Sequence, residues 1–137
     1  MRVMVPRYKI SMFEGMFKMK WYAAHVIMHI KFKDGNQDCY PVWENIYLVC
    51  GNSNDEAFEK AENIGKEWEG DSLGTLTWDE RPATWVFAGV RKLIECDDSN
   101  NRPNNGTEIT YSQFLVKNKE SLDLLVNGEI VDITYEE

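Results

Sequence analysis

Two histidines, His25 and His29, stand four positions apart in an apolar segment and are the first residues that suggest chemistry. On an α-helix this spacing puts both imidazoles on one face, where they can bind a single metal ion. On a β-strand they share a face but lie roughly 13 Å apart, which is too far for one ion. Every second residue from Tyr22 to Phe32 is apolar, and this period of two predicts a strand. We therefore expect no metal site here, but two histidines on a semi-exposed face of a sheet.

Two carboxylates, Glu44 and Glu108, stand in segments that read as strands. Glu44 lies between Trp43 and Ile46, and a carboxylate held among apolar side chains can act as a general acid or base. If Glu44 and Glu108 shared one pocket, the chain would be a small enzyme or a binder of small ligands. The alternative is that each carboxylate faces solvent or pairs with Lys or Arg, which is the commoner arrangement for a strand glutamate.

Motifs for phosphate, dinucleotide or acyl-transfer chemistry are absent from the sequence. It contains no G-x-S-x-G segment and no glycine-rich loop with P-loop or dinucleotide spacing. The three cysteines, Cys39, Cys50 and Cys96, show no C-x-x-C spacing, so neither a disulfide framework nor a zinc site is implied. We expect reduced structural thiols, no cofactor, no metal, and a function that is not enzymatic.

The charge balance narrows the possible partners. The 137 residues include 15 Lys and Arg against 23 Asp and Glu, a net charge of -8, which disfavours nucleic acid and an anionic membrane. The longest uncharged apolar run, 21–30, is far shorter than the roughly 20 residues that span a bilayer. No segment resembles a secretory signal, so we expect a cytoplasmic protein. Residues 1–20 hold five basic residues against one acidic one; we interpret them as a basic, Met-rich extension before a single domain over 21–137.

The remaining elements follow from periodicity and capping. Alternating apolar residues predict five further strands, over 40–50, 75–78, 83–96, 107–116 and 129–135. A long helix is predicted from Ser53, which forms a capping box with Glu56, to Gly70, and a short one over 119–126. Gly65 on the apolar side of the long helix suggests close approach to a sheet. We expect an α+β domain: a mainly antiparallel sheet of five to six strands, with both helices packed on one face.

Five tryptophans are many for a chain of this length. Trp68 belongs to the apolar stripe of the long helix, so we assign it to the core. One helix covers one face of a sheet, yet the predicted strands carry apolar residues on both faces. We expect aromatic side chains to gather on the second face and to form an interface with a protein partner or a second copy of the chain. This predicted surface consists of Trp21, Trp43, Tyr47, Trp85 and Phe87.

Five short segments resemble one bacterial family. They are WYAA at 21–24, VWENIYLV around Glu44, DEAFEKAE at 55–62, FAGV at 87–90 and GTEITYS at 106–112. Together they span roughly residues 20–115 and are similar to the domain of unknown function 4288. The resemblance implies a small, single-domain bacterial protein without an assigned activity, and it carries no catalytic role to any residue. The matching positions are Trp21, Tyr22, Glu44, Lys60, Gly89, Gly106 and Glu108.

Three functions remain open from the sequence. We favour a non-enzymatic, cytoplasmic interaction module that self-associates or binds a protein partner through its aromatic surface. The first alternative is a small enzyme or small-ligand binder that uses Glu44 and Glu108. The second is an inhibitor or immunity-type protein, because a small acidic protein can mask a basic surface on its target.

Overall fold

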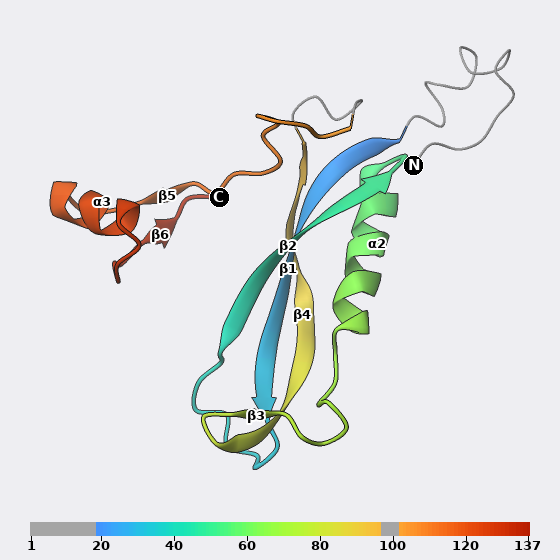
Figure 1. Cartoon of the computed structure of the whole chain (residues 1–137), viewed down its shortest axis with the longest axis vertical. Coiled ribbons are helices and arrows are strands. Elements are labelled where there is room, and N and C mark those ends of the chain that lie inside the picture. The colour runs from blue at the N-terminus through green and yellow to red at the C-terminus, as the bar shows by residue number, and fades with distance from the viewer. Residues whose placement is uncertain (1–18, 97–101) are drawn as a thin grey trace, which may run out of the picture.

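The computed structural model describes residues 19–96 and 102–137 and has an α+β architecture (Figure 1). Nearly all of the basic extension over 1–20 falls outside the described residues, as do residues 97–101 of the polar surface loop that the composition of 97–106 predicts. The described residues form two helices and two antiparallel sheets. The elements are β1 (Lys20–Phe32), β2 (Val42–Gly51), α2 (Asn54–Glu67), β3 (Thr77–Trp78), β4 (Arg81–Glu95), β5 (Phe114–Leu115), α3 (Lys119–Val126) and β6 (Thr134–Tyr135).

β1 lies in the middle of a four-stranded sheet with the strand order β2-β1-β4-β3. Both of its neighbours run antiparallel to it, so that Tyr22 pairs with Val49 of β2 on one side and with Glu95 of β4 on the other. The strand predicted for this segment is confirmed. The helical alternative, which would have brought His25 and His29 onto one metal ion, is wrong because the segment is paired along both edges.

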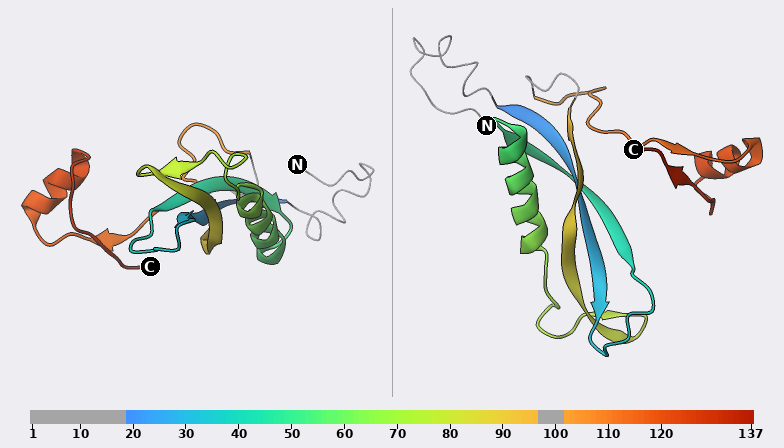
Figure 2. Two further views of the ribbon diagram at one scale, coloured as in Figure 1. Left: turned by 90° about the horizontal axis from the view of Figure 1, so that it is seen from below. Right: turned by 180° about the vertical axis from the view of Figure 1, so that it is seen from behind.

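Helix α2 begins where the capping box predicted. The Ser53 hydroxyl accepts a hydrogen bond from the backbone N–H of Glu56 (3.2 Å), and the Glu56 carboxylate accepts one from the N–H of Asn52 (3.2 Å). The helix lies along one face of the main sheet (Figure 2), and the even-numbered residues of β1 face it. The core between them consists of Tyr22, Ala24, Val26, Met28, Val49, Ala57 and Ala61.

Strand β4 bulges twice where it pairs with β1. The register skips Arg91 and Ala88, and the intervening Gly89 has a φ of +156°, a conformation that favours glycine. A bulge redirects the side chains around it. The bulge at Arg91 brings both Arg91 and Lys92 to the sheet face opposite α2. There the Arg91 guanidinium lies 3.9 Å from the carboxylate of Glu44.

The C-terminal part departs from the predicted single sheet. Among the described residues β5 and β6 pair only with each other, so the main sheet has four strands instead of five to six. Residues 107–113, predicted as a strand, join no ladder and pass over the face opposite α2, where Thr110 contacts His25. A period of two indicates alternating sides but does not show whether a neighbouring strand pairs with the segment. α3 lies with β5 and β6 away from the main sheet, so the two helices do not share a face (Figure 1).

Neither helix is long. α2 has 14 residues, an ordinary length, and its last turn tightens because the N–H of Trp68 bonds the carbonyl of Gly65; the long helix predicted to reach Gly70 is therefore wrong. α3 has eight residues and starts after the cap Asn118, within its predicted bounds. In the part of the chain that the structure describes, no helix is long and apolar enough to cross a bilayer.

Candidate binding groove

Most of the aromatic residues predicted for the second face lie instead on the α2 side of the sheet. The residues on that side are Trp43, Tyr47, Trp85 and Phe87, each paired with an even-numbered residue of β1. Trp21 pairs with Cys50 and faces the other way. The predicted gathering of all five on one open face is thus wrong, because register and bulges decide which side of β2 and β4 meets α2. Their role in binding stays a prediction.

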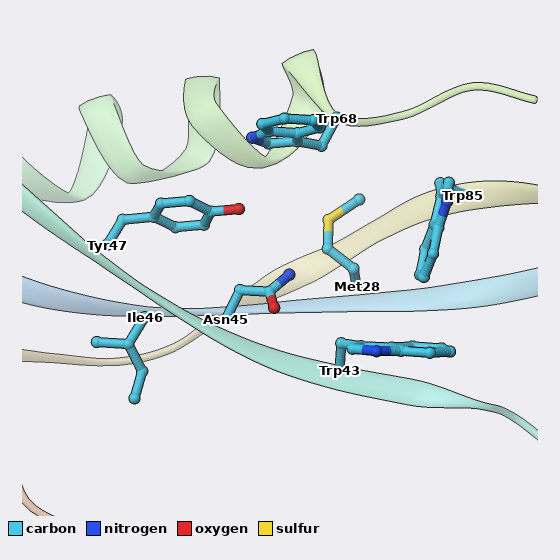
Figure 3. A pocket seen from close by; sticks show the side chains of 7 residues that line it. All are labelled: Met28, Trp43, Asn45, Ile46, Tyr47, Trp68 and Trp85. Atoms are coloured by element: carbon cyan, nitrogen blue, oxygen red, sulfur yellow. The ribbon is translucent and has the colours of Figure 1, made fainter. Parts of the chain in front are cut away.

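An open groove lies on the α2 side, between the C-terminal end of α2 and strand β2 (Figure 3). It encloses about 470 Å³. Its floor is formed by the buried Met28 of β1, and most of its walls are aromatic. The residues that line it are Met28, Trp43, Asn45, Ile46, Tyr47, Trp68 and Trp85.

The aromatic walls of the groove pack against one another. The ring of Trp43 lies edge-on to Trp85, with centroids 4.7 Å apart, and edge-on to Trp78 at 5.1 Å. Such edge-to-face pairs are the preferred arrangement of aromatic rings and hold each side chain in place. Trp68, by contrast, is 62% exposed. Its assignment to the core was wrong because it caps the helix and lies past the last buried turn.

Polar groups and negative potential accompany the aromatic walls. In Figure 3 the amide of Asn45 and the hydroxyl of Tyr47 point into the space between Trp43 and Trp68. The C-terminal end of α2, where the helix dipole is negative, lies beside Trp68; Glu67 and Glu69 flank that residue in the sequence, and Lys66 stands in the same turn. With a net charge of -8 on the chain, the groove suits an apolar ligand that carries positive charge.

The groove runs along a strand whose outer edge is open. β2 is the first strand in the order β2-β1-β4-β3, and no strand among the described residues pairs with its other side. On the sheet face opposite α2, its residues Val42, Ile46 and Leu48 are 54%, 47% and 43% exposed. Edge strands are normally protected by lysine, proline or bulges, and β2 has no lysine or proline and no break in its register. Among the described residues this edge pairs with no strand, and Lys60 of α2 donates a hydrogen bond to the carbonyl of Cys50 near the end of β2.

The opposite face of the sheet holds a buried polar chain centred on His25. The Nδ1 atom of His25 lies 2.7 Å from Oε2 of Glu44, and its Nε2 atom lies 2.5 Å from the hydroxyl of Thr110. A carboxylate only accepts, so Nδ1 donates to Glu44, and Nε2 forms the second hydrogen bond of the ring with the Thr110 hydroxyl. His25 is fully buried, so its predicted semi-exposed position is wrong. The residue that covers it, Thr110, is 85 positions away, and no local pattern indicated it.

The hydrogen-bonded side chains Thr110, His25 and Glu44 follow one another in the order of a nucleophile, a base and an orienting carboxylate. Their geometry satisfies both nitrogens of a buried imidazole and fastens the segment around Thr110 to the sheet. Glu44 is held further by the hydroxyl of Tyr135 at 3.4 Å and by Arg91. Glu44 is thus a paired strand glutamate, the alternative that the sequence left open.

Glu108 is not brought to Glu44. It is exposed, and in the described part of the chain it makes no hydrogen bond or ion pair with Glu44. His29 lies apart from His25 and stacks edge-on against Tyr40, with centroids 5.4 Å apart. Across residues 19–96 and 102–137 no three His, Cys, Asp or Glu side chains gather as metal ligands do.

Comparison with known families agrees with the motifs. Residues 21–111 match the family described as Domain of unknown function (DUF4288), and this match covers more than half of the chain. The chain belongs to the DUF4288 family. No curated protein and no solved structure matches it. The DUF4288 span contains every residue of the groove and the three hydrogen-bonded side chains of Thr110, His25 and Glu44. The elements α3, β5 and β6 lie beyond it.

Proposed function

We propose that this protein is an interaction module that binds an extended, basic segment of a protein partner along the open edge of β2. The observation that carries the proposal is the position of the aromatic groove directly beside that edge. An added strand forms backbone hydrogen bonds with the edge and turns alternate side chains to opposite faces of the sheet. Side chains on the α2 side then enter the groove.

The groove defines which side chains the partner presents. Trp43, Tyr47 and Trp85 offer aromatic faces and edges to an apolar side chain, and cations are attracted to such faces within about 6 Å. Lysine and arginine combine an apolar stem with a positive end. The stem can lie against the aromatic walls while the positive end meets the polar groups and the negative end of α2. The acidic chain favours a basic segment further, because opposite charge steers association.

The site of action is the cytoplasm, in line with the exposed thiol of Cys39, which an oxidising compartment would tend to pair. A second copy of this chain is the competing occupant of the edge. It would bring another net charge of -8 to the interface, which favours the basic partner over self-association.

The test uses a synthetic peptide in which lysine alternates with valine around one central tryptophan, titrated into the full chain by calorimetry. We expect binding that weakens at least about tenfold in Trp68→Ala, because an exposed groove wall is lost. Leu73→Ala, which removes a fully exposed side chain outside the groove, should leave binding unchanged. The same peptide N-methylated on alternate amides should not bind, because it cannot complete the ladder.

Three results would contradict the proposal. Equal binding by the N-methylated peptide would exclude strand addition, and equal binding by Trp68→Ala would exclude the groove. A concentration-dependent dimer in sedimentation velocity that excludes the peptide would assign the edge to a second copy.

A further inference from the structure

A second cleft lies on the face of the sheet opposite the aromatic groove. It encloses about 310 Å³, and its walls come from the end of β4 and from the segment after the polar loop. The residues that line it are Arg91, Lys92, Ile94, Tyr111 and Glu137. The bulge in β4 is what places two adjacent cations at this one site.

One carboxylate already occupies the cleft. The ammonium group of Lys92 bonds one oxygen of the Glu137 side chain, and Nη2 of Arg91 lies 3.8 Å from the other. Lys92 also donates to the carbonyl of Tyr111 at 2.7 Å. The side chains of Lys92 and Glu137 are only 14% and 15% exposed, so the ion pair is shielded from water. A shielded ion pair is stronger than one at an open surface.

The cleft and its occupant come from different parts of the chain. Arg91, Lys92, Ile94 and Tyr111 all lie within the DUF4288 span of 21–111, and Glu137 lies outside it. The family domain therefore builds a carboxylate site by itself, and a later segment fills it. The position of Glu137 is fixed by a hydrogen bond from the N–H of Glu136 to the carbonyl of Gln113 (2.9 Å), and both of these residues also lie outside the DUF4288 span.

We propose that this cleft is a binding site for small organic acids and that the Glu137 side chain is its internal competitor. The carboxylate of the ligand takes the place of the Glu137 carboxylate between Arg91 and Lys92. Its apolar or aromatic body lies against Ile94 and the ring of Tyr111, over which Lys92 stands at 5.5 Å. The site is independent of the groove, which opens on the other face.

The experiment titrates benzoate into the full-length protein and follows binding by calorimetry and by amide chemical shifts. Benzoate should bind Glu137→Gln at least about tenfold more tightly than the unmodified chain, because the competitor has lost its charge. Lys92→Met in the Glu137→Gln background should abolish that gain. Lys33→Met in the same background is the matched control: Lys33 pairs with Asp71 at a distance of 2.5 Å elsewhere, so the gain should remain.

Benzamide, which has the shape of benzoate without the charge, and inorganic phosphate provide the ligand controls. Neither should bind Glu137→Gln as benzoate does. Equal binding of benzamide would exclude carboxylate recognition, and equal binding of phosphate would show a general anion site; either result overturns the proposal. So does a folded Glu137→Gln variant, by circular dichroism, that gains no affinity for benzoate. Trp68→Ala should leave benzoate binding unchanged, so this test is separate from that of the groove.

Discussion

Gly65 of α2 lies against the ring of Phe87 of β4 so closely that a β-carbon at Gly65 would stand 2.6 Å from Cε1 of that ring and nearer still to Cδ1. A glycine in a helix costs roughly 1 kcal/mol relative to alanine, and here it lets an aromatic ring fill the space between helix and sheet. The close approach predicted from the sequence is confirmed. This contact sets how near α2 packs to the sheet beside the groove.

Gly65→Ala should therefore destabilise the protein although alanine is the better helix former. Overpacking in a core costs about 1–3 kcal/mol, which outweighs the gain in helix propensity. Urea denaturation should show a lower free energy of unfolding. Phe87→Leu combined with Gly65→Ala should recover part of the loss relative to the sum of the single changes, because the smaller side chain makes room. A Gly65→Ala protein more stable than the unmodified chain would show that Phe87 moves aside freely.

Thr110→Val should reveal how strongly the polar chain at His25 holds the segment over the sheet. The variant keeps the shape of the side chain but leaves the buried Nε2 atom without its hydroxyl partner, which costs about 1–3 kcal/mol. In a His25→Leu background the same change should cost almost nothing, and a double-mutant cycle by urea denaturation measures the difference. Ser112→Ala, an exposed position in the same segment, is the control. Additive losses would mean that Thr110 and His25 are not coupled.

The thiols should differ in reactivity. Burial raises the pKa of the Cys96 thiol, and the side chain is almost inaccessible, whereas Cys39 is exposed. Because the exposed thiolate is the reactive form, iodoacetamide at neutral pH should modify Cys39 at least about tenfold faster than Cys96, as read by mass spectrometry. Urea should remove the difference. Faster modification of Cys96 in the folded protein would contradict its buried position.

The ion pair between Arg81 and Asp34 should contribute to acid stability. Nε and Nη2 of Arg81 bond the two carboxylate oxygens of Asp34 at 2.8 and 3.0 Å, and this contact lowers the pKa of Asp34 in the folded protein. A lowered folded pKa means that the stabilisation is complete above the unfolded pKa and is lost as pH falls through the folded one. Asp34→Asn should therefore flatten the acid limb of a plot of thermal midpoint against pH. An unchanged acid limb would show that the pair contributes nothing.

The sequence predicted best what a single segment decides by itself. The alternation from Tyr22 to Phe32 identified β1 as a strand, and the capping pair Ser53 and Glu56 located the start of the helix. Both signals are local, and here the rest of the chain agrees with them, whereas the same alternation over 107–113 forms no ladder.

The errors came from relationships between segments. Trp43 and Trp85 were assigned to the wrong face because the register with β1, not their own strand pattern, sets their side. The burial of His25 depends on Thr110, which arrives from a segment that forms no ladder. Trp68 kept the helical spacing of a core residue, yet α2 ends before it. Each of these needs a contact that spacing within one segment does not encode.

The central place of β1 has a consequence for how the protein is made. β1 leaves the ribosome before β2 and β4, and it can pair with β2 as soon as that strand is synthesised. Its second edge must wait until β4 has been synthesised as far as Glu95, with the whole of α2 in between. During that interval the nascent hairpin exposes one unpaired edge of β1, a strand with an apolar side chain at every second position from Tyr22 to Phe32, and an exposed edge of this kind is prone to misassembly and chaperone capture.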